Sequence, residues 1–101
     1  MDMVSAMLAV EAVSWGDGSI GLTVASHNSL CAGHILLFAS DDQKRRYLPG
    51  LARGETLGGW CLTEPAAGSD AAAIQTRAKR KGSVYVLNGS KVFVTQGSTG
   101  G

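Results

Sequence analysis

The sequence predicts an α+β chain, with helices in its first half and antiparallel strands in its second. Residues 3–52 combine helical apolar spacing with helix-capping signals. From Thr56 onward, β-forming residues and turn signals replace them. Helices that precede strands, rather than alternating with them, are typical of segregated α+β layers. We therefore divide the chain into a helical part, residues 1–55, and a β part, residues 56–101.

Length and charge narrow the class of protein. A chain of 101 residues has the size of one small domain, and a net charge of +1 indicates no general attraction for nucleic acid or anionic membranes. Residues 20–38 approach the length of a membrane span, but the polar residues 27–29 at their centre favour a buried soluble helix. Cys31 and Cys61 are expected to be free, buried thiols. The N-terminus lacks the features of a secretion signal or a transit peptide, so we do not expect a secreted protein.

The first two helices are predicted from apolar spacing and a break between them. Apolar residues at helical intervals predict a helix over residues 3–15. Residues 16–18, Gly-Asp-Gly, interrupt it, and either Asp17 or Ser19 is a suitable cap for the next helix. The second helix is expected over residues 20–38 and is predicted to be largely buried.

A third, shorter helix is predicted from a capping box. Residues 40–43 read S-D-D-Q, in which the serine satisfies a backbone N–H of the first turn while the glutamine reaches back. The helix is expected to end near Pro49 and Gly50, and its basic triplet, residues 44–46, is interpreted as a solvated face.

Strand signals occupy the second half. Residues 57–63 and, more weakly, residues 74–79 are predicted strands. Residues 83–87 and 91–95 flank Asn88-Gly89, a sequence typical of a two-residue hairpin turn, and are expected to pair.

Two segments carry the strongest functional signal. Residues 60–70 read W-C-L-T-E-P-A-A-G-S-D, and residues 85–95 read Y-V-L-N-G-S-K-V-F-V-T. In order and spacing they resemble the flavin-binding face of the acyl-CoA dehydrogenases. The corresponding family segments read close to C-V/L-T/S-E-P-x-x-G-S-D and N-G-x-K-x-W-I-T-N-G. The resemblance covers nearly the whole chain but only the join between the first helical domain and the β domain of that family, so we expect residues 1–101 to be part of a longer protein.

The resemblance implies an FAD cofactor and an acyl-CoA substrate. In the family, a carboxylate removes the α-proton while a hydride leaves the β-carbon for the flavin. That catalytic glutamate lies downstream of the β domain, so no catalytic residue is expected within residues 1–101. The positions that match the cofactor-binding motifs are Trp60, Cys61, Leu62, Thr63, Gly68, Ser69, Phe93, Val94 and Thr95. Ser69 is also implied to contact the substrate.

These residue types suit a flavin nucleotide. Gly68 permits close backbone approach, and the N–H groups of a tight loop favour a pyrophosphate. If residues 91–95 form a strand, Phe93 and Thr95 share one face, placing an aromatic ring and a hydroxyl together. The sequence departs from the family pattern at three places: Phe93 stands at the usual tryptophan position, Gln96 stands at the usual asparagine position, and Ala66-Ala67 replaces a more common glycine-containing pair.

Other polar residues are interpreted as structural. Glu64 is expected to fix its loop as a hydrogen-bond acceptor rather than act as a base, and Asp70 to cap local backbone. His27 and His34 are expected to serve packing. We expect no metal site, because no cysteine or carboxylate lies at matching spacing.

The resemblance also implies partners and a compartment. The whole protein is expected to pass electrons to an electron-transfer flavoprotein, to form a homotetramer, and to act in fatty-acid β-oxidation in a bacterial cytoplasm or a mitochondrial matrix. The helix around residues 27–30 resembles that of short-chain members, so a short- or medium-chain substrate is expected. An acyl-CoA oxidase, a flavin monooxygenase of the same fold and a non-catalytic nucleotide-binding module are the alternatives. Expressed alone, the chain is expected to fold poorly, because its strands leave unpaired edges.

Overall fold

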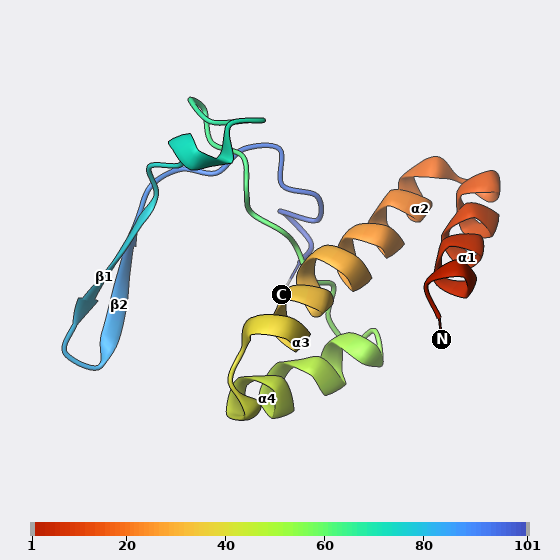
Figure 1. Cartoon of the computed structure of the whole chain (residues 1–101), viewed down its shortest axis with the longest axis horizontal. Helices are drawn as coiled ribbons and strands as arrows, with labels where there is room; N and C mark the ends of the chain where they lie inside the picture. The colour runs from red at the N-terminus through yellow and green to blue at the C-terminus, as the bar shows by residue number, and fades with distance from the viewer. Residues whose placement is uncertain (1, 101) are drawn as a thin grey trace. The chain divides into compact units, whose positions relative to one another are not determined.

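The computed structural model describes residues 2–100, and Figure 1 shows the path of the chain. The chain divides into two compact units. One combines the residues up to Trp60 with those from Thr95 onward, and the other is Cys61–Val94. The helices α1 to α4 lie in the first unit, and the strands β1 and β2 lie in the second. This order of elements confirms the predicted α+β class.

Helices α1 (Met3–Gly16) and α2 (Gly18–Ala25) lie side by side as a helical hairpin (Figure 1). Asp17 separates them, and its carboxylate accepts hydrogen bonds from two N–H groups in the first turn of α2. Gly21 permits the close approach of the two helices, because a Cβ at this position would collide with Ser14. The first predicted helix and the Asp17 cap are confirmed.

The predicted second helix is present but is not a regular α-helix throughout. After α2, the chain continues through a π-helical segment, η1 (Ser26–Ala32), into α3 (Gly33–Phe38). The Gly33 N–H donates to the Asn28 carbonyl, five residues earlier, which is the spacing that defines a π-helix.

The predicted burial of this helical stretch is wrong for most of its large apolar residues. Leu37 and Phe38 are 71% and 78% exposed. The helices that pack against the stretch are α1 and α4, and they cover only part of its surface. Within residues 2–100, no helix has both the length and the apolar character needed to cross a membrane.

Helix α4 (Asp41–Ala52) begins where the capping box predicts. The Ser40 hydroxyl accepts from the Gln43 N–H, and the Gln43 side chain accepts from the Ser40 N–H. The helix was expected to end near Pro49 and Gly50, and it continues through that proline to Ala52, two residues past Gly50. Proline near a helix end removes one hydrogen bond and leaves the last turn intact.

Gly54 is the residue that ends α4. Its φ of +69° is the left-handed conformation that glycine adopts without steric cost. The N–H groups of Gly54 and Glu55 donate to the carbonyls of Leu51 and Gly50, both at 3.0 Å. These two bonds form a Schellman motif, which satisfies carbonyls that the helix end leaves free.

The strand predicted over residues 57–63 does not form. Gly58 is anchored to the helices instead: its N–H donates to His27 Nδ1 at 2.9 Å, and a Cβ there would collide with Cys31. Because Nδ1 accepts this bond, Nε2 carries the ring proton and donates to the Leu51 carbonyl at 3.1 Å. His27 is buried and joins η1, α4 and this segment, which confirms its predicted packing role.

The hairpin lies earlier in the sequence than predicted. Strand β1 (Arg77–Lys81), which replaces the strand expected over residues 74–79, pairs antiparallel with β2 (Val84–Asn88). Gly82 and Ser83 form the two-residue loop between them, and Gly82 has the positive φ, +63°, that such a turn requires at its first position.

The expected turn at Asn88-Gly89 is therefore wrong, and residues 91–95 do not form a strand. Gly89 serves a different purpose: a Cβ there would collide with the Thr76 side chain. The glycine lets the chain that leaves β2 pass close to the residue that precedes β1.

Candidate functional site

The first motif contains a tight turn in the second unit. Glu64 and Ala67 exchange two backbone hydrogen bonds, of 2.9 and 3.1 Å, around Pro65 and Ala66. Gly68 and Ser69 follow this turn and are exposed. Within the part of the chain that the structure describes, neither of their N–H groups donates to another backbone group. Both are thus available to an anion.

Asp70 ends this loop with a local cap. Its carboxylate accepts from the Ala72 N–H at 3.2 Å, at the start of the short 3₁₀ helix η2 (Ala71–Ala73). The predicted capping role of Asp70 is confirmed.

Glu64 fixes the motif to the base of the hairpin. Its Oε2 accepts from the Gln75 N–H at 2.7 Å, and its Oε1 accepts from the Thr76 N–H and from Lys91 Nζ, both at 2.9 Å. Thr76, Lys91 and the Gln75 N–H lower the pKa of Glu64 from 4.5 to about 2. A carboxylate with this pKa and these partners is a hydrogen-bond acceptor rather than a base, as predicted.

The two motif segments lie side by side in the second unit. The Val92 N–H donates to the Thr63 carbonyl at 2.9 Å, and Lys91 Nζ donates to the Leu62 carbonyl at 2.8 Å. Lys91 therefore contacts the first motif twice, through Leu62 and Glu64. We assigned Lys91 no role from the sequence, although it is the lysine of the N-G-x-K pattern.

Three other predicted cofactor residues in this unit differ in exposure. Phe93 has a φ of +55° and is 92% exposed, so it does not lie on a strand beside Thr95 as the alternation predicted. A positive φ is uncommon for an aromatic residue and is typical of strained functional positions. Val94 is half-buried, and Cys61 is an exposed free thiol, so its predicted burial is wrong.

The remaining predicted cofactor residues, Trp60 and Thr95, belong to the first unit. The Trp60 ring packs on the His34 ring with centroids 4.1 Å apart, which confirms the packing role predicted for His34. Thr95 is half-buried and precedes Gln96, a second non-glycine residue with positive φ, +60°.

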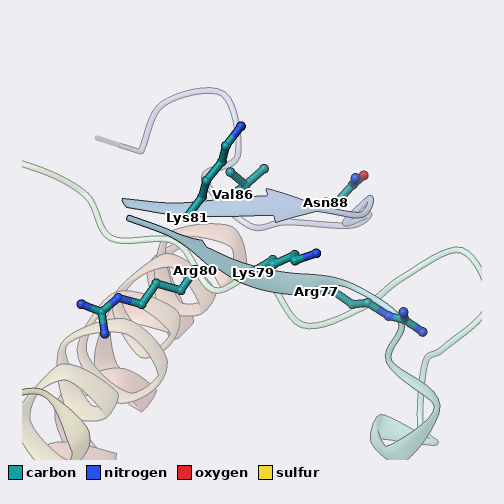
Figure 2. A pocket seen from close by; sticks show the side chains of 6 residues that line it. All are labelled: Arg77, Lys79, Arg80, Lys81, Val86 and Asn88. Carbon is teal, nitrogen blue, oxygen red and sulfur yellow. The ribbon is translucent and has the colours of Figure 1, made fainter. Parts of the chain in front are cut away.

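A cationic groove on the hairpin was missed by the sequence analysis. Figure 2 shows the side chains that line it. It has a volume of about 550 Å³ and is lined by Arg77, Lys79, Arg80, Lys81, Val86 and Asn88. The signal that could have revealed it is the run R-A-K-R-K of residues 77–81.

Family models match both halves of the chain. The model described as "Acyl-CoA dehydrogenase, N-terminal domain" matches residues 1–55, and the model described as "Acyl-CoA dehydrogenase, middle domain" matches residues 59–100.

Two curated relatives show how much of a longer protein the match covers. The short-chain specific acyl-CoA dehydrogenase of Clostridium acetobutylicum is 46% identical over 96 residues, which are 95% of this chain and 25% of that protein. The mitochondrial very long-chain specific acyl-CoA dehydrogenase of Macaca fascicularis is 49% identical over 90 residues, which are 87% of this chain and 14% of that protein. The chain spans a quarter or less of the length of these two relatives.

Solved structures agree with these matches. Butyryl-CoA dehydrogenase from Megasphaera elsdenii has a TM-score of 0.92 and 41% identity over 98% of this chain and 26% of that chain. A glutaryl-CoA dehydrogenase from Mycobacterium smegmatis, solved in complex with FADH2, has a TM-score of 0.88 and 39% identity over 92% of this chain and 24% of that chain. Because the two family models together match nearly the whole sequence, this chain belongs to the acyl-CoA dehydrogenase family.

Proposed function

We propose that the chain is part of an FAD-dependent acyl-CoA dehydrogenase, an oxidoreductase that introduces a double bond next to an acyl-CoA thioester. The observation that carries the proposal is the pairing of the two motif segments through Thr63 and Val92, reinforced by Lys91. We assign residues 1–55 to the helical domain of that enzyme and residues 56–101 to its β domain.

The residues present fit an FAD cofactor. The exposed N–H groups of Gly68 and Ser69 suit its pyrophosphate, and a Cβ at Gly68 would meet no atom within 4 Å, so the approach to this backbone is open. The exposed ring of Phe93 offers an aromatic face to the flavin ring. We assign cofactor contacts to Trp60, Cys61, Leu62, Thr63, Gly68, Ser69, Phe93, Val94 and Thr95, and a substrate contact to Ser69. FAD supplies the hydride acceptor for the reaction.

We propose a short- or medium-chain acyl-CoA as the substrate. Similarity to the Clostridium short-chain enzyme and to the Megasphaera butyryl-CoA dehydrogenase supports this choice. The very long-chain relative has comparable identity, so acyl length is the property that a substrate series has to test first.

The whole protein is proposed to be a homotetramer that passes its electrons to an electron-transfer flavoprotein. Its catalytic glutamate is proposed to lie outside residues 1–101. Bacterial and mitochondrial relatives support a place in a bacterial cytoplasm or in a mitochondrial matrix.

The visible spectrum of the whole protein tests this function. Anaerobic addition of butyryl-CoA is expected to bleach the flavin band, because the substrate reduces the cofactor. A flavin band that a series of acyl-CoAs leaves unchanged would reject acyl-CoA oxidation and favour another flavoenzyme of this fold. Protein that stays colourless after incubation with FAD would reject the cofactor and favour a non-catalytic module.

A further inference from the structure

Three side chains on one side of the helical stretch hold the segment that leads into the first motif. His27 Nδ1 accepts from the Gly58 N–H at 2.9 Å, and a Cβ at Gly58 would lie 2.3 Å from Cys31 Sγ. The His34 ring packs on the Trp60 ring with centroids 4.1 Å apart. The three side chains follow one another at intervals of four and three residues, the spacing of neighbours on one helix face. All of these residues belong to the first unit.

His27 is the buried member of this group. Its exposed fraction is 9%, and its Nε2 donates to the Leu51 carbonyl. That carbonyl also accepts from the Gly54 N–H at 3.0 Å, so it keeps a donor without the histidine. Gly58 is buried as well, and within residues 2–100 its N–H has no hydrogen-bond acceptor other than His27. Because an unsatisfied buried donor costs more than an average hydrogen bond contributes, loss of His27 acts mainly on Gly58.

The segment that His27 holds has few other anchors. Gly58 and Gly59 carry no side chain, and glycine restricts the backbone less than any other residue does. Trp60 follows directly, and both it and His34 are only half-buried. His27 itself lies in the π-helical segment η1, a rare conformation that is frequent at functional sites. The bond from Gly58 to His27 therefore fixes the chain at the point where the first motif begins.

We propose that His27 is a positioning residue for the cofactor site. Through its bond to the Gly58 N–H it sets the place of the Trp60 ring, to which we assign a cofactor contact. As far as it concerns the cofactor, the proposal rests on the proposed function. Without an acceptor at residue 27, Gly58 is expected to move until water satisfies its N–H, and Trp60 is expected to leave the His34 ring with it.

Two conservative variants of the whole protein separate the two bonds of the imidazole. In His27→Asn, Oδ1 stands as many bonds from the backbone as Nδ1 and accepts from Gly58, while the donor to Leu51 is lost. In His27→Gln, the amide nitrogen takes the place of Nε2 and donates to Leu51, while the acceptor for Gly58 is lost. Each variant loses one hydrogen bond and the ring, so both are expected to lower the Tm by a similar few degrees.

The emission of Trp60 reports its position independently of catalysis. Its contribution is isolated, in whole protein freed of any flavin, by subtracting the emission of the matching Trp60→Phe variant. His27→Gln is expected to shift this emission to longer wavelength, because the ring enters water, whereas His27→Asn is expected to retain the wild-type emission.

The affinity for FAD is the second measurement. The Kd for FAD is expected to rise about tenfold in His27→Gln and less than about twofold in His27→Asn. Ser40→Ala is the control for destabilisation: it removes the cap of α4, so it is expected to lower the Tm and to change neither the Trp60 emission nor the Kd.

Equal emission shifts in the two His27 variants, or no shift in either, would overturn the inference, because His27 would then serve stability alone. A Trp60 ring that moves without a change in the Kd for FAD would overturn the link to the cofactor. Hydrogen exchange covers a variant that does not fold: in wild-type protein the Gly58 amide is expected to exchange slowly, and exchange as fast as that of an exposed amide would also overturn the inference. Failure of the proposed function is distinct, because it appears as whole protein that takes up no FAD while the two variants still differ in Trp60 emission.

Discussion

Glu64 shows how a single carboxylate acts as a structural element within a binding motif. Its side chain is 6% exposed, and its two oxygens accept from three donors that lie 11 to 27 residues further along the chain. Burying a charge is unfavourable unless it is paired and hydrogen-bonded, and here both conditions are met. The group therefore joins the turn after Thr63 to both ends of the hairpin.

The pH dependence of stability follows from this environment. The pKa of Glu64 is lowered from 4.5 in the unfolded chain to about 2 in the folded one. A lowered pKa stabilises the folded state above the unfolded value, and this stabilisation is lost as the pH falls from about 4.5 towards 2. In Glu64→Gln, the amide keeps one acceptor oxygen and places its N–H₂ against donors at the other position, either the Gln75 N–H or the Thr76 N–H and Lys91 Nζ, so the variant is expected to have a lower Tm at neutral pH. Measured against pH, the Tm difference from wild type is expected to stay constant above about pH 5 and to shrink below about 4.5.

Glu55→Gln is the matched control. Glu55 also pairs with a cation, Arg53, but both side chains are more than half exposed. Exposed pairs contribute little to stability, so this variant is expected to melt within a degree or two of wild type at every pH. A Tm difference for Glu64→Gln that does not change with pH would contradict the role assigned to its charge.

At the scale of elements, the sequence predicted best those features that depend on near neighbours. The start of α4 was predictable because Ser40 and Gln43 satisfy each other within one turn. The predicted hairpin was placed wrongly because Asn-Gly is a strong local turn signal. The observed position of β1 depends instead on Gln75 and Thr76, directly before it, whose N–H groups donate to Glu64 more than ten residues away.

The same distinction applies to the candidate site. The motif positions were recognisable from their spacing, but the contact between Lys91 and the Leu62 carbonyl joins residues 29 apart in sequence. Neither strand alternation nor residue type specifies such a contact. The positive φ of Phe93 was equally unpredictable, because aromatic residues rarely adopt it.

Two glycines distinguish the observed hairpin from the one that the Asn-Gly signal predicted. Gly82→Ala is expected to destabilise the protein by about 1–2 kcal/mol, because alanine is strained at positive φ. Gly89→Ala is expected to cost more, about 3 kcal/mol, because its Cβ also collides with Thr76. Thermal melts of the whole protein measure both changes.

Asparagine substitutions are the control for this pair. Asparagine tolerates positive φ, so Gly82→Asn is expected to be milder than Gly82→Ala, whereas Gly89→Asn is expected to be as harmful as Gly89→Ala. If the turn were centred on Asn88-Gly89 instead, the opposite result would be found: substitutions at Gly82 would cause little destabilisation, and asparagine would be accepted at position 89.

On the scale of the whole molecule, the surface is large for the mass. The described chain exposes 7762 Å², whereas a folded monomer of 10.4 kDa exposes about 5,400 Å². Much of the excess is apolar: Trp15 is 92% exposed, and the large apolar residues of α1 and β2 are exposed as well. The buried apolar residues are few, with Leu51 in the first unit and Ala67 in the second.

This imbalance predicts how residues 1–101 behave when expressed alone. Burial of apolar surface is the main stabilising contribution to folding, and the entropy cost of ordering each residue opposes it. With about 40% more exposed surface than a folded monomer of this mass, the isolated chain is expected to lack a cooperative thermal transition and to bind a dye for exposed apolar surface. Calorimetry and amide NMR measure this directly: a broad or absent melt and poorly dispersed amide signals are expected. A sharp melt with well-dispersed signals would show instead that the two small cores suffice, and that the exposed apolar faces are compatible with an independently stable domain.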